Sequence, residues 1–214
     1  MPALHRITLI AAAFFIPLVL AMPVSHGATA VQLDLPALVH HSDVIVIAQV
    51  QDTSTSLESD GRVYTTVELR TDEPLLGHPA KQFKLRQVGG VDPDTGIGTH
   101  APGLPHFTPG ERVFLFLEER SANLVLTGLA QGKFTIAQGP DGATDYVIPR
   151  TPGLRTIPRR DDDASPPLKE QSLQLTTHER LYSQTHRLDH FRDEVMQVID
   201  ALADHDAIDP EEVP

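Results

Sequence analysis

The sequence predicts a mainly β domain, an all-β barrel or sandwich, with a short helix before it and an amphipathic helix after it. Two observations lead to this prediction. Short runs rich in Val, Ile and Phe recur between Gly-, Pro- and Asp-containing turns through the middle of the chain. A helical spacing of apolar residues is found only outside that region. With 214 residues, 40% of them hydrophobic, the chain can bury the core of one such domain.

A short helix is expected at the start of the domain. Asp34 has a side chain that can accept a hydrogen bond from the first turn, and Pro36 is tolerated there. Leu35, Leu38 and Val39 then fall on one face. We expect this helix to end near residue 42.

Seven strands are expected after that helix. Residues 44–50 are β-branched and almost wholly apolar, which is typical of a buried strand. Residues 63–69 alternate between apolar and polar, which predicts one wet face, and Asp60-Gly61 marks the turn before them. The other five strands are expected at residues 83–86, 113–117, 124–127, 133–136 and 146–148.

The barrel domain, residues 31–150, is expected to give way to a linker and a helical tail. Residues 151–177 are rich in proline and charge and predict a linker. Residues 178–214 predict an acidic helical tail, since residues 159–214 hold 14 acidic and six basic side chains. One face of the tail helix is apolar: Leu188, Phe191, Val195, Ile199 and Leu202. That face can pack against the barrel, which avoids an exposed apolar stripe, or dock in a groove of a partner.

Residues 1–30 are typical of a secretory signal peptide. Arg6 is followed by an apolar run over residues 7–22, and Ala28-Thr29-Ala30 fits a small-residue cleavage site. The apolar run is short for a membrane span and contains Pro17, so we expect cleavage and no membrane span afterwards. The chain is therefore expected to be exported, to the periplasm or the medium.

Composition excludes several classes of function. The chain has no cysteine, which excludes disulfide scaffolds, thiol catalysis and cysteine-ligated metals, and which suits a bacterial exported protein. The formal net charge of -12 argues against a nucleic-acid partner, because phosphate backbones require clustered positive charge. No serine lies in a Gly-x-Ser-x-Gly elbow.

The candidate binding residues lie in a long Gly- and Pro-rich segment, residues 89–112. It holds two carboxylates and two imidazoles: Asp92, Asp94, His100 and His106. Long loops in compact domains are often functional, and these side-chain types can bind a divalent metal. Their spacing matches no metal motif, so a loop that covers one end of the barrel is the alternative, and neither a metal nor a cofactor is assigned.

A second metal hypothesis uses the tail. If residues 186–190 are helical, His186 and His190 lie one turn apart and can share a metal ion. A solvated helix face is the alternative, because a stable site needs more than two ligands.

Four segments of the chain resemble the netrin/metalloproteinase-inhibitor-like branch of the OB-fold and a family of exported bacterial proteins with the same pattern. They are residues 38–50, 65–77, 109–117 and 128–134, so the resemblance covers about residues 38–137. The resemblance implies a small OB-like (netrin-like) barrel and a protein partner, such as a protease. The animal inhibitors chelate zinc through an N-terminal cysteine, which this chain lacks, so no inhibitory residue is carried over.

The sequence therefore favours an exported, non-enzymatic binding or accessory module that acts on a protein partner. Two alternatives remain open. One is a metal-dependent hydrolase that uses Asp92, Asp94, His100 and His106, and the other is a periplasmic metal-binding protein that uses the tail histidines.

Overall fold

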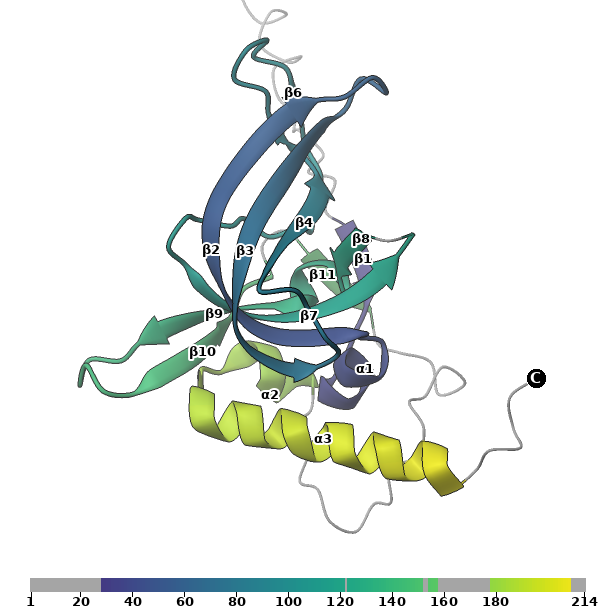
Figure 1. Ribbon diagram of the computed structural model, residues 1–214, viewed down its shortest axis with the longest axis vertical. Helices are drawn as coiled ribbons and strands as arrows, with labels where there is room; N and C mark the ends of the chain where they lie inside the picture. The colour runs from purple at the N-terminus through teal and green to yellow at the C-terminus, as the bar shows by residue number, and fades with distance from the viewer. Residues whose placement is uncertain (1–27, 122, 152–153, 158–177, 209–214) are drawn as a thin grey trace, which may run out of the picture.

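The computed structural model describes residues 28–121, 123–151, 154–157 and 178–208, and this part of the chain is mainly β (Figure 1). In chain order the elements are β1 (Ala28–Val31), α1 (Leu35–His40), β2 (Val44–Leu57), β3 (Val63–Leu76), β4 (Gln82–Val88), β5 (Gly90–Val91), β6 (Gly98–Thr99), β7 (Arg112–Arg120), β8 (Asn123–Leu126), the 3-10 helix η1 (Leu129–Gly132), β9 (Lys133–Gln138), β10 (Asp145–Pro149), β11 (Leu154–Ile157), α2 (His178–Ser183), β12 (His186–Arg187) and α3 (Leu188–Ile208). All seven expected strands are present, and α1 confirms the expected first helix.

One large sheet organises the molecule. Its strand order is β12-β10-β9-β7-β2-β3-β4-β8, and β8 also pairs with β7. The pairings of β2, β3, β4, β8 and β7 therefore follow one another in a ring, with β9, β10 and β12 extending the sheet from β7. The β4–β8 contact is parallel and the other pairings in this sheet are antiparallel.

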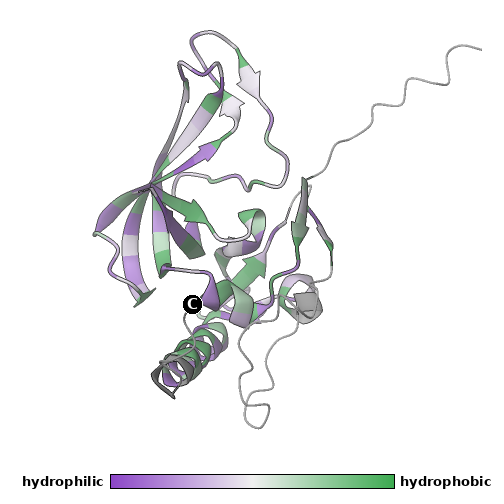
Figure 2. Cartoon of the chain, turned by 90° about the vertical axis from the view of Figure 1, so that its right-hand side faces the viewer, coloured by the Kyte–Doolittle hydropathy of each residue, from purple (hydrophilic) through white to green (hydrophobic). Residues whose placement is uncertain are grey.

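β2 and β3 form a long hairpin that rises above the rest of the molecule in Figure 1. Each strand has 14 residues, twice the length that the sequence predicts, and register shifts at three places in β2 bend it. The first half of β2 is buried, whereas its second half, residues 51–57, is polar and largely exposed. In Figure 2 the raised part of the hairpin accordingly mixes polar and apolar residues.

Both faces of the lower sheet are covered, which creates two apolar clusters. Ile45 and Ile47 of β2 face the helices, together with Phe114 and Phe116 of β7. The alternate residues of the same strands face the inside of the ring of strands, where they form the second cluster: Val44, Val46, Ala48, Val50, Val67, Leu69, Leu85, Val113, Leu115, Leu117 and Leu126. Residues 113–117 are therefore buried on both sides, as their continuous apolar run predicts.

The three α-helices cover one face of the sheet, and α3 lies along it (Figure 1). Phe191 is 1% exposed, and its ring centroid lies 5.0 Å from that of Phe114 and 5.2 Å from that of Phe134. The rest of the apolar face expected on this helix also packs here, with Val195 and Leu202 buried and Leu188 and Ile199 half-buried. The structure thus shows the alternative in which this face packs within the chain.

Two regions differ from the expectation. The tail is not one helix, because residues 186–187 pair with β10 as a strand between α2 and α3. The expected linker contains β11, which pairs in parallel with β1. Residues 152–153 and 158–177 of that linker, 1–27 of the expected signal peptide and 209–214 lie outside the described residues. In the described part, no helix is both long and apolar enough to cross a membrane.

The strand β1 falls on the expected cleavage site. Ala28, Thr29 and Ala30 pair with residues 154–156, and Val31 pairs with Ile157. Gln131, which is fully buried, holds the adjoining segment: its Nε2 donates to the Val31 carbonyl at 3.0 Å, and its Oε1 accepts from the Leu33 N–H at 2.9 Å. The position of residues 31–33 is therefore fixed from inside the domain.

Candidate functional site

The segment 89–112 does not bring its four candidate residues together. Asp94, His100 and His106 are exposed, whereas Asp92 is 7% exposed. Among the described residues, no group of three or more His, Asp or Glu side chains could hold a metal ion. The structure therefore gives no support to a metal centre in this segment.

Asp92 has a structural role at the small β5–β6 hairpin. Its Oδ1 accepts from the N–H of Asp94 at 2.9 Å, and its Oδ2 accepts from the N–H of Leu57 at 3.1 Å. The hydrogen bond from Asp94 is the main cause that lowers the pKa of the Asp92 carboxyl. The carboxylate thus joins this hairpin to the far end of β2.

The tail histidines do not form the expected helical pair. His186 lies in β12, before α3 begins, and its ring contacts Phe191 with centroids 5.6 Å apart. Its Nε2 lies 3.2 Å from the carbonyl oxygen of Leu181. The expected i, i+4 spacing on one helix is wrong for His186 and His190, because the helix starts between them.

A hollow at the end of the ring of strands is the most distinctive feature that could hold a ligand. It has a volume of about 790 Å³ and lies between the segment before β7 and the start of β9. Its walls carry mostly polar side chains: Pro105, His106, Thr108, Glu111, Lys133, Thr135, Arg150 and Thr151. The volume lies within the usual range of small-molecule sites, about 300–1,000 Å³.

Lys133 is a buried cation in the wall of this hollow. It is 5% exposed, and its ammonium donates to Glu111 Oε1 at 2.7 Å and to the His106 carbonyl at 2.8 Å. The ammonium also lies 4.7 Å from the ring centroid of Phe107. Burial lowers the pKa of Lys133, while the hydrogen bond and charge of Glu111 act in the opposite direction.

A tight turn places Glu111 beside Lys133. In the segment Thr108-Pro109-Gly110-Glu111, the N–H of Glu111 donates to the Thr108 carbonyl at 2.9 Å. Gly110 has a φ of 86°, which suits the third position of a type II turn after proline. The Thr108 N–H donates in return to Glu111 Oε2 at 3.2 Å. The sequence of this turn thus fixes the carboxylate.

Both oxygens of the Glu111 carboxylate are in use. Oε1 accepts from Lys133 and also from the Thr135 hydroxyl at 2.6 Å, while Oε2 accepts from Thr108. Arg150, which also lines the hollow and is exposed, forms no ion pair within the described residues. Its charge lowers the pKa of Lys133, so the two cations are near one another. The hollow therefore carries two cations and one carboxylate, in a chain of net charge -12.

The backbone of residues 105–106 is held by side chains of two different strands, β4 and β9. The Gln87 amide of β4 donates to the Pro105 carbonyl at 2.9 Å, and Lys133 of β9 donates to the next carbonyl, that of His106. Phe107 then packs against the inner apolar cluster. Residues 105–107 are therefore held by contacts with β4, β9 and the inner apolar cluster.

A second feature is the free edge of β2. Val50 exchanges backbone hydrogen bonds with Gly110 and Glu111, but beyond it no described strand pairs with this edge. The Leu57 N–H points to the same side, where Asp92 caps it. Because backbone groups alternate along an antiparallel strand, Thr53 and Thr55 also direct their N–H and C=O groups to this open edge.

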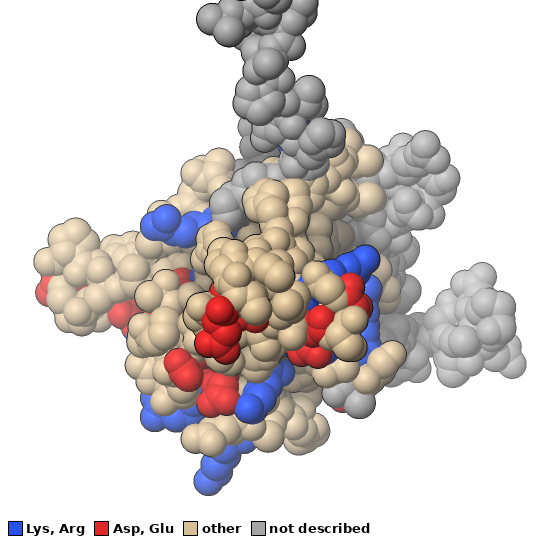
Figure 3. All heavy atoms as spheres, turned by 90° about the horizontal axis from the view of Figure 1, so that it is seen from above, with Lys and Arg blue, Asp and Glu red and all other residues tan. Residues whose placement is uncertain are grey.

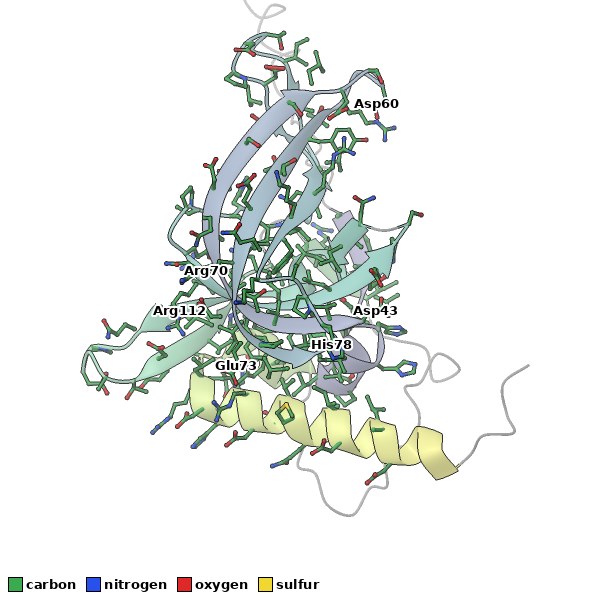
Figure 4. The ribbon with its side chains drawn as sticks, in the orientation of Figure 1. Asp43, Asp60, Arg70, Glu73, His78 and Arg112 are labelled. Atoms are coloured by element: carbon green, nitrogen blue, oxygen red, sulfur yellow. The ribbon has the colours of Figure 1, made fainter. Side chains whose placement is uncertain are left out.

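Several charged side chains elsewhere form ion pairs, some within one strand and some across strands. Figure 4 shows Arg70 and Arg112 near the place where the hairpin passes β9 and β10. Arg70 lies 3.1 Å from Asp72, and Arg112 donates to Asp145 of β10 at 2.6 Å. Seen from the hairpin end in Figure 3, acidic and basic side chains are interspersed rather than gathered in one basic face. We interpret these pairs as surface braces, each of small energy.

The sequence did not single out Lys133 and Glu111 as a site. Both lie in segments that carry the family resemblance, but the sequence assigns Lys133 only to a strand. One signal was present in the sequence: the Pro-Gly-Glu turn before a buried strand.

Comparison with known proteins gives no relative. No protein-family model matches the chain, and no curated protein matches it. The proposals below therefore depend on the sequence and on the geometry of the chain itself.

Proposed function

We propose that the chain is an exported, non-enzymatic binding module on an OB-like barrel, and that it holds an extended segment of a partner protein along the free edge of β2. The ring of five strands, with one parallel contact between β4 and β8, supports the OB-like assignment. The signal-peptide pattern of residues 1–30 supports export. A protease is one class of partner that the family resemblance suggests.

The observation that carries this proposal is the open edge at Thr53 and Thr55. An edge strand with free N–H and C=O groups can accept a further strand, which gains main-chain hydrogen bonds. Residues 51–56 have exposed or half-exposed Ser, Thr, Asp and Gln side chains, although β5 lies against Thr55, whose hydroxyl donates to the Val91 carbonyl at 2.7 Å. Among the described residues, the outward N–H and C=O groups of Thr53 and Thr55 have no backbone partner and are available to a partner strand. Pairing with β3 on the other side holds β2 in an extended conformation before a partner arrives.

The metal-dependent alternatives have weaker support. The Asp92 carboxylate is already used by backbone N–H groups, and the described residues contain no three-ligand cluster. His186 and His190 lie in different elements. We therefore propose binding rather than hydrolysis.

The test removes one outward N–H group from the edge. Thr53→Pro should abolish retention of a partner from the exported fraction of the source cells, because proline has no N–H to offer to a partner strand. The substitution should leave the β2–β3 pairing in place, because the N–H of Thr53 points to the open side of β2 and not towards β3. Thr53→Val keeps the N–H and the shape, so it should retain the same partner as wild type.

Both variants are first compared with wild type by thermal unfolding, to establish that they are folded. Amide hydrogen exchange of Thr53 and Thr55 should also slow when the retained partner is added. Equal retention by Thr53→Pro and wild type, with no change in exchange at these amides, contradicts the proposal.

A further inference from the structure

We propose that the hollow beside Lys133 binds a small molecule through an oxyanion group, a carboxylate or a phosphate. This site adjoins the β2 edge at Glu111 but does not depend on a protein partner. Its donors come from β9, from the segment before β7 and from the residues after β10.

The first argument is the unused hydrogen-bonding capacity of Lys133. An ammonium has three N–H donors, and two of them go to Glu111 and to the His106 carbonyl. No described group accepts a hydrogen bond from the third, and Lys133 lines the hollow with its ammonium 4.7 Å from the Phe107 ring centroid. The side chain is almost fully buried, so its position is fixed before a ligand arrives.

The second argument is the charge balance. Glu111 neutralises Lys133 and has both oxygens engaged by Lys133, Thr135 and Thr108. It therefore leaves the charge of Arg150, an exposed residue that also lines the hollow, without an ion-pair partner among the described residues. A structural ion pair alone explains Lys133 and Glu111, but it does not explain a second cation in the same hollow. An oxyanion between the two cations removes their mutual repulsion.

The third argument is the fit of chemistry and size. A guanidinium binds carboxylate or phosphate through two parallel N–H groups, and the Thr151 hydroxyl in the same wall can add a third donor. A volume of about 790 Å³ exceeds the size of a bare phosphate ion. The ligand is thus expected to carry an organic body attached to the oxyanion.

The experiment titrates the full mature protein with three probes: inorganic phosphate, acetate and citrate. Binding is followed by calorimetry and by the NMR signal of the Lys133 ammonium, which burial should make observable. We expect saturable binding of at least one probe, with a shift of that signal. Phosphate alone would assign a phosphate ligand, and acetate or citrate alone a carboxylate ligand.

Arg150→Gln tests the site, because it removes the cation that has no ion-pair partner among the described residues and leaves the Lys133–Glu111 pair intact. It should weaken binding at least about tenfold, the usual loss for a charged hydrogen bond. Arg62→Gln makes the same change of charge at the exposed tip of the β2–β3 hairpin and should leave affinity unchanged.

Three outcomes overturn the proposal. They are the absence of saturable binding by all three probes, equal weakening by Arg150→Gln and Arg62→Gln, and binding that leaves the Lys133 signal unmoved. None of them bears on partner retention at Thr53, so this proposal and the proposed function can fail separately.

Discussion

Replacement of Phe191 by alanine should show whether α3 belongs to the domain. The ring is 1% exposed and contacts three other phenylalanine rings, with centroids 5.0 Å from Phe114, 5.2 Å from Phe134 and 6.5 Å from Phe116. These partners lie on β7 and β9, so Phe191 is the main link between the helix and the sheet. Phe191→Ala would leave a cavity among these rings.

The expected loss of stability is large. Removal of a buried phenylalanine side chain costs about 3–5 kcal/mol, against a total of about 5–15 kcal/mol for a typical domain. For a chain of this size, about 2–4 °C of Tm is lost per kcal/mol, so Tm should fall by roughly 6–20 °C. Gln197→Ala, on the exposed side of the same helix, should change stability by less than about 0.5 kcal/mol.

Urea unfolding followed by circular dichroism measures this difference. The reasoning requires one cooperative transition in which helix and strand signals are lost together. If Phe191→Ala loses less than about 1 kcal/mol, or if the helix melts separately and leaves the β signal intact, then α3 is an appendage. In that case its apolar face would again be a candidate docking surface.

Three further predictions concern other parts of the molecule. Lys133→Met should destabilise the domain by about 3–5 kcal/mol, because Glu111 is left buried without a cation. In the same unfolding assay, the double variant Lys133→Met, Glu111→Leu should recover much of that loss, because no buried charge remains unpaired. The Thr144 hydroxyl and N–H lower the pKa of Asp141 from 3.8 to about 2. The contribution of this carboxylate to stability is therefore complete above pH 4 and is lost as the pH falls towards 2. In thermal unfolding, Asp141→Asn should lose less stability than wild type between about pH 4 and pH 2. A chain that starts after Ala30 lacks three of the four residues of β1, so hydrogen exchange in β11 should be faster than in the uncleaved chain, and equal exchange would contradict the β1–β11 pairing.

The sequence predicts correctly those elements that are determined by residues close to one another in the chain. The Asp34 cap was expected from its place before an apolar face, and its Oδ1 does accept from the Ala37 N–H at 2.9 Å. The strands of the core were found because apolar residues alternate or run together. The outer half of β2 was missed, because residues 52–57 are polar and are held in a strand by pairing with β3 rather than by burial.

The candidate site could not be found in the same way. Lys133 and Glu111 are 22 residues apart, and only the register of β7 against β9 brings them together. Asp92 attracted attention because a loop carboxylate can bind metal, but its oxygens are occupied by backbone N–H groups of residues on both sides of the loop. Composition identifies side chains that can bind a ligand, whereas only tertiary contacts show which of them already have all their hydrogen bonds within the chain.

The two proposed sites meet at Glu111, and this decides which variants can separate them. Its side chain holds Lys133, while its backbone carbonyl accepts from the Val50 N–H, where the open edge of β2 begins. Replacement of Lys133 should therefore disturb the edge as well as the hollow. Arg150 has no contact with this turn among the hydrogen bonds and ion pairs of the described residues, so Arg150→Gln should alter oxyanion binding and leave partner retention at Thr53 unchanged.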